Sequence, residues 1–128
     1  MSKVVLIVED DVRNMKLFRD LLQHHGFAIL EATNGKEGVK LALEKSPDLI
    51  LMDIQMPVMD GLEATRIIKA DSRTKGIPIV ALTSYAMKGD RERVLKVGCD
   101  EYISKPVDIR ELTKMVDHFC QAVPVRPS

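Results

Sequence analysis

Short apolar runs alternate along this chain with longer stretches in which apolar residues recur at every third or fourth position. The short runs are rich in Val, Ile and Leu and stop at polar or turn-forming residues, which is typical of strands buried on both faces of a sheet. The longer stretches have the spacing of amphipathic helices. The pattern predicts strands at residues 4–8, 27–30, 48–53, 79–82 and 102–104.

Turn and capping residues predict where the helices begin and end. Gly26 ends the first helix, which begins at Val12, and the second helix ends near Lys45. The last helix begins at the capping residue Asp108. The other predicted helix ranges are 60–70, 88–97 and, for the last helix, 108–121. Strands that alternate with helices in this way predict an α/β fold, a parallel sheet covered by helices on both faces.

Composition and charge exclude several classes of function. The chain has 128 residues, enough for one domain, and a formal net charge of zero, which gives no reason to bind nucleic acid or a membrane surface. No apolar stretch approaches the ~20 residues of a membrane span, and residues 1–3 lead directly into a strand, so we expect neither membrane insertion nor a signal peptide. Cys99 and Cys120 form no metal or disulfide pattern, which favours a cytoplasmic location. We expect one domain at 1–123, a short tail at 124–128 and no output domain.

The third predicted strand ends abruptly on a carboxylate, Asp53, and Pro57, Asp60 and Gly61 mark a loop that leads into the next helix. A charge at the end of a buried strand is costly unless it is paired. Because open parallel sheets bind ligands at the carboxyl ends of their strands, Asp53 is a candidate site residue. A helix N-cap or an ordinary surface Asp is the alternative interpretation.

Polar groups follow three other strands: Glu9 and Asp10 after the first, Thr83 after the fourth and Lys105 after the fifth. In a parallel sheet these groups share one edge with Asp53. Three carboxylates repel one another unless one takes up a proton or a cation binds. Oxygen ligands without His or Cys suit Mg²⁺, and an ammonium group beside a hydroxyl suits a tetrahedral oxyanion. The pattern therefore predicts a phosphoryl group carried on Asp53.

Four blocks of sequence resemble the receiver domains of two-component response regulators: VEDD at 8–11, LMDIQMPVMDG at 51–61, ALTS at 81–84 and ISKP at 103–106. Each block is a weak signal alone, but the ordered set is specific and covers nearly the whole chain. The resemblance implies a flavodoxin-like (CheY-like), doubly wound five-stranded sheet with strand order 2-1-3-4-5 and five helices. It also implies a phosphoacceptor signalling protein rather than an enzyme.

The resemblance assigns roles to the residues at the sheet edge. Asp53 would accept the phosphoryl group of a phosphohistidine, and Lys105, joined to Pro106 by a cis peptide bond, would pair with that group. Glu9 stands where many receivers have Asp, and we expect metal binding to tolerate the difference. The implied Mg²⁺ ligands are Glu9, Asp10, Asp53 and the backbone carbonyl of Gln55.

The resemblance also implies positions for switching and for phosphoryl lifetime. Thr83 and Tyr102 would form the switch, although Thr83 could simply end a strand and Tyr102 could simply pack in the core. Gln55 and Tyr85, two residues beyond Asp53 and Thr83, would set how long the phosphoryl group lasts.

A narrower similarity is to single-domain receivers that act in bacterial cell division, and it rests on NMKLF at 14–18, AMKGD at 86–90 and CDEYISKP at 99–106. It implies sensor histidine kinases or histidine phosphotransfer proteins as partners. Other signalling proteins would bind a face formed by helix 88–97, strand 101–104 and helix 108–121.

Two other functions fit parts of the pattern. A magnesium-dependent aspartyl phosphatase similar to the haloacid dehalogenases would use Asp53 as nucleophile, but it would need a second Asp where this chain has Gln55. A flavodoxin-like cofactor binder would need a Gly-rich phosphate loop after the first strand, where the acidic residues 9–11 would repel phosphate. The phosphorylation-controlled switch is therefore the preferred interpretation.

Overall fold

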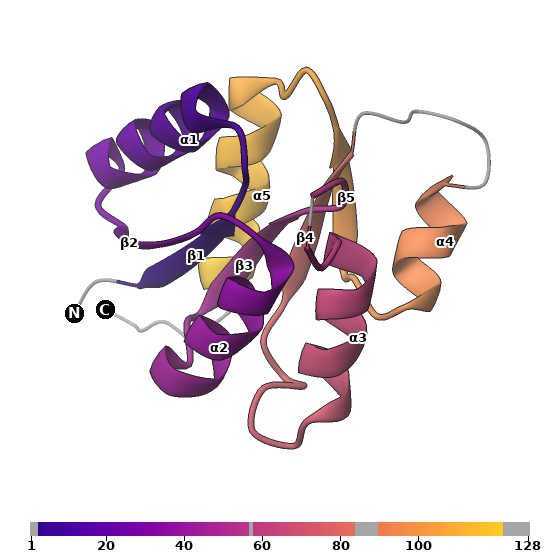
Figure 1. The fold of residues 1–128 in the computed structure, drawn as a ribbon. Helices are drawn as coiled ribbons and strands as arrows, with labels where there is room; N and C mark the ends of the chain where they lie inside the picture. The colour runs from indigo at the N-terminus through magenta and orange to yellow at the C-terminus, as the bar shows by residue number, and fades with distance from the viewer. Residues whose placement is uncertain (1–2, 57, 84–89, 122–128) are drawn as a thin grey trace.

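A five-stranded parallel sheet lies between two layers of helices in the computed structural model, which describes residues 3–56, 58–83 and 90–121 (Figure 1). The strand order is β2-β1-β3-β4-β5, which confirms the predicted doubly wound fold. All four pairings are parallel. The strands are β1 (Val4–Val8), β2 (Ala28–Ala32), β3 (Leu49–Asp53), β4 (Ile79–Thr83) and β5 (Glu101–Ser104).

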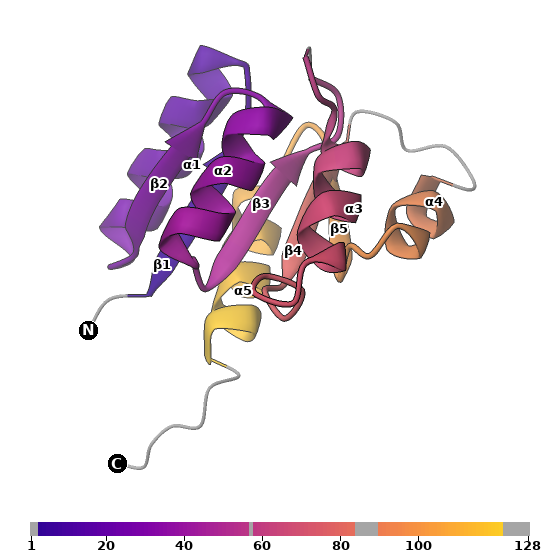
Figure 2. The same cartoon turned by 60° about the horizontal axis from the view of Figure 1, so that its bottom comes forward.

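The helices divide between the two faces of the sheet. Figures 1 and 2 show α1 and α5 on one face and α2 and α3 on the other, with α4 beyond α3. A parallel strand pair needs a crossover between its members, and a helix supplies it while covering the sheet. The helices are α1 (Val12–His24), α2 (Gly35–Lys45), α3 (Gly61–Ala70), α4 (Asp90–Lys96) and α5 (Ile109–Gln121).

Two apolar clusters hold these layers together, one on each side of the sheet. One joins β-strand residues to Phe18 of α1 and Leu112 of α5, and the other joins them to Ala64 of α3 and Val94 of α4. Every residue of β3 and β4 is buried, as expected for central strands covered on both faces. Full burial of a side chain such as Phe18 stabilises the fold by roughly 1.5–3 kcal/mol relative to exposure.

Most of the predicted element boundaries are confirmed, and one strand differs. The prediction placed the second strand at 27–30, but β2 extends to Ala32, which pairs with Val8 of β1. The predicted strand followed the apolar run and stopped before the charged residue Glu31. In the structure β2 is an edge strand, so Glu31 is exposed and its carboxylate lies 3.0 Å from Arg19. An edge position allows a charged residue within a strand.

Carboxyl and amide side chains begin four of the helices. The Oδ1 atom of Asp108 accepts hydrogen bonds from the backbone amides of Arg110 at 2.8 Å and Glu111 at 3.2 Å, which confirms the predicted cap. Such caps satisfy amides that have no partner within the helix. The described part of the fourth helix begins at residue 90, so the predicted start at 88 lies outside the described residues. The other capping residues are Asp11, Asn34 and Asp60.

Candidate functional site

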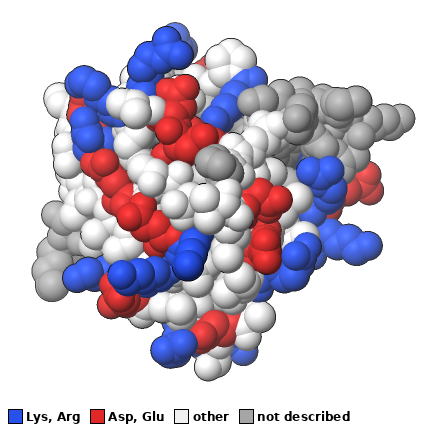
Figure 3. All heavy atoms as spheres, in the orientation of Figure 1, with Lys and Arg blue, Asp and Glu red and all other residues white. Residues whose placement is uncertain are grey.

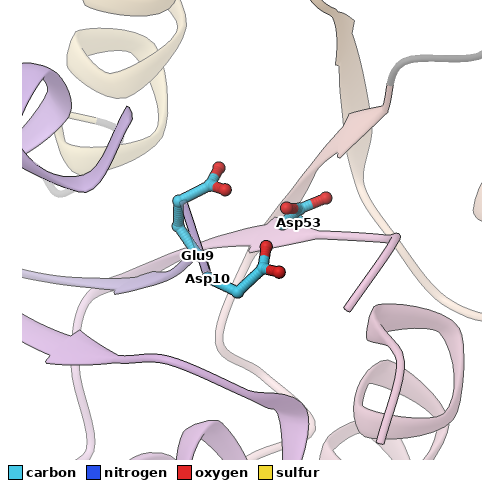
Figure 4. Close-up of side chains that lie close together, drawn as sticks. All are labelled: Glu9, Asp10 and Asp53. Atoms are coloured by element: carbon cyan, nitrogen blue, oxygen red, sulfur yellow. The ribbon is translucent and has the colours of Figure 1, made fainter. Parts of the chain in front are cut away.

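Three carboxylates meet at the carboxyl edge of the central strands. Glu9 and Asp10 follow β1, Asp53 ends β3, and one oxygen of each lies within 4.8 Å of the others (Figure 4). Glu9 and Asp53 are almost completely buried, at 1% and 2% exposure, whereas Asp10 is exposed. The sheet register explains the meeting, because β1 and β3 are neighbours and Val8 pairs with Met52, the residue before Asp53.

The loop between β3 and α3 holds the Asp53 carboxylate from one side. The backbone amide of Gln55 donates a 3.0 Å hydrogen bond to Oδ1 of Asp53. The amide of Gly61 donates to the carbonyl of Ile54 at 3.0 Å, and this closes the loop at the start of α3. A Cβ atom on Gly61 would overlap the backbone carbonyl of Asp53, so only glycine allows α3 to begin so close to it.

Lys105 holds the same carboxylate from the other side. Its Nζ atom lies 3.1 Å from Oδ2 of Asp53 and 3.2 Å from Oε1 of Glu9. Nζ donates a hydrogen bond to Asp53 and a longer one, of 3.5 Å, to Oε2 of Glu9, whereas its contact with Glu9 Oε1 is only a close approach of opposite charges. Glu9 Oε1 is the one buried side-chain N or O atom among the described residues that accepts no hydrogen bond.

Burial favours the protonated, uncharged form of Glu9. Removal from water and, to a smaller extent, the neighbouring Asp53 raise the pKa of Glu9, the Asp11 amide and Lys105 oppose the rise, and the net result is a pKa of about 7. For Lys105, burial lowers the pKa, but the carboxylates of Asp53 and Glu9 outweigh burial and the net change is upward. The site therefore carries more acidic groups than its one ammonium group can neutralise.

The donor atoms fit a hard divalent cation. An open pocket of about 590 Å³ exposes the acid cluster to solvent. Its oxygen atoms include one buried carboxylate oxygen without a hydrogen bond, and neither His nor Cys is among the described residues that line it. Such a set suits Mg²⁺, which prefers carboxylate, carbonyl and water oxygens. The lining residues are Glu9, Asp10, Asp11, Asn14, Asp53, Gln55 and Lys105.

The residues expected to form the switch lie on one face of the sheet. Thr83 pairs with Ser104 and Ala81 pairs with Tyr102, so both side chains point to the side covered by α2, α3 and α4. Thr83 is buried, and its carbonyl accepts a 2.7 Å hydrogen bond from the Lys105 amide. The strand pairing therefore connects Thr83 directly to the residue that pairs with Asp53.

Of the remaining expected features, the structure describes the cis peptide bond and Gln55 but not Tyr85. The peptide bond between Lys105 and Pro106 is cis. Tyr85, expected to influence phosphoryl lifetime, lies outside the described residues. Gln55 lies at the site, where its amide contacts Asp53.

Sequence analysis missed Asp11 as a supporting residue. Its backbone amide donates to Oε2 of Glu9 at 3.1 Å, and its side chain caps α1 through Arg13 at 2.8 Å and Asn14 at 3.1 Å. The run of three acids at 9–11 drew attention to charge alone. An acid just before Val12, where the helical pattern begins, is an N-cap signal that could have identified it.

Comparisons with known proteins agree with this geometry. A family model for the response regulator receiver domain matches residues 5–117. The polar-differentiation response regulator DivK of Brucella anthropi is 47% identical over 119 residues, which cover 93% of this chain and 97% of that protein. DivK of Brucella melitensis is 46% identical over the same length. This chain belongs to the response regulator receiver family.

Solved structures show the same fold. The receiver domain of a sensor histidine kinase from Pseudomonas aeruginosa, with a magnesium ion coordinated in its active-site cleft, is 34% identical with a TM-score of 0.87; the match covers 94% of this chain and 98% of that one. The receiver domain of Saccharomyces cerevisiae Ssk1, crystallised with the histidine phosphotransfer protein Ypd1, is 32% identical with a TM-score of 0.89; coverage is 97% and 93%.

These matches confirm the receiver assignment and the narrower similarity to a regulator of bacterial cell differentiation. The chain is a receiver-type signalling protein rather than an aspartyl phosphatase. Within the described residues, no helix is both long and apolar enough to cross a bilayer.

Proposed function

We propose that this protein is a response regulator in which Asp53 accepts a phosphoryl group from a phosphohistidine in the presence of Mg²⁺. The observation that supports this most strongly is the position of the Asp53 carboxylate. It lies between the Gln55 amide at 3.0 Å, the Lys105 ammonium at 3.1 Å and two further carboxylates. An aspartate that only ended a strand would not need these partners.

The residues at the site have different roles in phosphoryl transfer. An oxygen of Asp53 attacks phosphorus, the bond from phosphorus to the histidine nitrogen breaks, and the imidazole leaves with the electron pair of that bond. Lys105 lies where it can pair with the oxygens of the transferred group. Glu9, Asp10, Asp53 and the Gln55 carbonyl would hold Mg²⁺, which supplies neutralisation of negative charge. Alignment and charge neutralisation are the main requirements of this reaction.

The output would pass through the surface of the receiver. A phosphoryl group on Asp53 offers the Thr83 hydroxyl a new hydrogen-bond acceptor, and inward movement of Thr83 leaves space for Tyr102. That change would alter the face made by α4, β5 and α5, which we propose as the binding surface for downstream signalling proteins. Acidic and basic side chains are interspersed on the face of the molecule shown in Figure 3, and the formal net charge of the chain is zero, so there is no electrostatic reason to expect DNA as the partner.

Sensor histidine kinases or histidine phosphotransfer proteins would supply the phosphoryl group. The co-crystal of the yeast receiver with its phosphotransfer protein supports partners of this class. The DivK relatives are named for polar differentiation and are matched over 97% of their length, which supports a role in bacterial cell-cycle control.

Phosphotransfer from a purified partner tests this function. A radiolabelled histidine phosphotransfer protein should pass its label to the wild type with Mg²⁺ and should not pass it to Asp53→Asn. Transfer to Asp53→Asn at the wild-type rate would contradict the proposal. Folding of Asp53→Asn, checked by circular dichroism, is the control.

A further inference from the structure

The start of α2 lies against the loop between β3 and α3. The backbone amide of Gly35, the first residue of α2, donates a 3.0 Å hydrogen bond to the carbonyl of Met59 in that loop. This amide has no partner within its own helix, so the contact satisfies it. Gly35 is buried, and a Cβ atom there would overlap the Met59 carbonyl oxygen and lie 3.0 Å from its carbon.

The same loop holds the proposed phosphoacceptor. The Gln55 amide donates to Oδ1 of Asp53 at 3.0 Å, and the Gly61 amide fastens the far end of the loop to Ile54. Between these points Val58 has φ +72°, although it is β-branched and 80% exposed. A β-branched residue is an outlier in this region, so the surrounding contacts impose the loop conformation.

We propose that Gly35 is a positioning residue for phosphorylation: its amide and its missing side chain fix the β3–α3 loop, which in turn orients the Asp53 carboxylate. This inference rests on the proposed function. Among the described residues, the Gly35 amide donates its hydrogen bond to Met59 rather than to the acid cluster, so Gly35 acts through the loop that carries Met59 and Gln55. The atoms that an added methyl group would meet are backbone atoms, which cannot rotate away.

An alanine at Gly35 must therefore displace the loop or the helix. Met59 and Gln55 belong to the same short loop, whose two ends are held together by the hydrogen bond between Gly61 and Ile54. We therefore expect a displacement at Met59 to move the Gln55 amide. Small misplacements of reacting groups cost large factors in rate. We expect Gly35→Ala to lower the rate of phosphorylation by acetyl phosphate at saturating Mg²⁺ at least fivefold and to shift the Gln55 amide resonance.

Two control variants separate positioning from stability. Asn34→Ala removes the side chain that accepts from the Glu37 amide at 2.9 Å, so it weakens the same helix end and leaves the Gly35 contact in place. Gly76→Ala adds a methyl group where a Cβ meets nothing within 4 Å. Both should phosphorylate within twofold of the wild type at a temperature where circular dichroism shows every variant folded.

Amide exchange in the wild type gives a test that needs no variant. If loop position and phosphoryl binding are coupled, the coupling is reciprocal. Beryllofluoride with Mg²⁺, a phosphoryl mimic, should therefore slow hydrogen exchange of the Gly35 amide at least threefold and leave the Gly76 amide unchanged. This measurement decides the proposal if Gly35→Ala does not fold.

The outcomes distinguish this inference from the proposed function. If the wild type is not phosphorylated at all, the proposed function fails. If the wild type is phosphorylated and Gly35→Ala loses less than fivefold, or Asn34→Ala loses as much as Gly35→Ala, the positioning role is overturned. Unchanged Gly35 exchange on addition of the mimic would overturn it as well.

Discussion

The ammonium group of Lys105 lies 3.1 Å from the Asp53 carboxylate, although Asp53 ends β3 and Lys105 follows β5, the strands on either side of β4. The same ammonium approaches Glu9 at 3.2 Å. One cation thus pairs with two of the three carboxylates in the cluster, which leaves the site with an excess of negative charge. Such an excess favours the binding of a divalent cation and makes the charge state of the site sensitive to pH.

Removal of Lys105 should disturb signalling more than folding. Lys105→Ala should lower the free energy of unfolding at pH 8, where Glu9 is ionised in the wild type, by less than the ~3–5 kcal/mol typical of a broken buried ion pair. Lys105 lowers the pKa of Glu9, so its loss allows Glu9 to take up a proton instead. Urea unfolding measures the change, with Lys16→Ala, which breaks an exposed pair with Asp20, as the control. A loss of 3 kcal/mol or more would mean that proton uptake does not compensate.

Glu9 should make the metal-free protein less stable as pH rises. Its carboxyl pKa is about 7 in the folded protein and 4.5 in the reference state, so the folded state binds the extra proton between these values. Stability from this group is complete below pH 4.5 and is lost as pH rises through about 7. A difference of this size corresponds to about 3 kcal/mol.

Glu9→Gln should therefore be more stable than the wild type at pH 8 without metal, and nearly equal to it at pH 4.5. Denaturant unfolding across this range, with chelator present, measures the difference. The exposed Glu44→Gln serves as the matched control. If the free energies of unfolding of the wild type and of Glu9→Gln changed with pH in parallel, the buried Glu9 carboxyl would not be the source of the pH dependence.

Mg²⁺ should stabilise the folded protein in a pH-dependent manner. A ligand at 100 times its dissociation constant stabilises by about 2.7 kcal/mol if it binds the folded state alone. Protonation of Glu9 competes with the metal, so the effect should weaken as pH falls below about 7. Thermal unfolding with Mg²⁺ or chelator measures it, and Asp10→Asn should reduce it. Equal stabilisation of wild type and Asp10→Asn would remove Asp10 from the ligand set.

Thr83 and Tyr102 should couple phosphorylation to partner binding. Beryllofluoride should tighten binding of the wild type to a kinase dimerisation domain at least tenfold, which is about 1.4 kcal/mol. Thr83→Ala and Tyr102→Ala should lose most of that gain, because the space that Thr83 vacates would no longer be filled by the Tyr102 ring. Calorimetry with and without the mimic measures this. An equal gain in all three proteins would show that the signal takes another route.

The sequence pattern was sufficient to predict features that depend on a single strand or helix. The run before Asp53 predicted both a buried strand and a carboxylate at its end, because strands covered on both faces are continuously apolar. Glu31 misled the prediction because its exposure depends on β2 being an edge strand, which becomes known only with the strand order.

Sequence analysis could not predict the hydrogen bonds that backbone amides donate. The amides of Gln55 and Gly35, which hold Asp53 and the β3–α3 loop, exist in every non-proline residue and leave no compositional signal. The buried Glu9 oxygen without a hydrogen bond likewise depends on the angle at which Lys105 approaches it. Resemblance identified which residue types meet at the site, and only the structure supplied how they are held.

Chemical mapping of the phosphorylated residue tests the central claim most directly. Borohydride reduces an aspartyl phosphate to homoserine, which peptide mass spectrometry locates after incubation with acetyl phosphate. The proposed function predicts homoserine at position 53 with Mg²⁺ present, none with chelator, and no labelling of Asp53→Ala. Homoserine at another aspartate, or labelling of Asp53→Ala equal to that of the wild type, would contradict it.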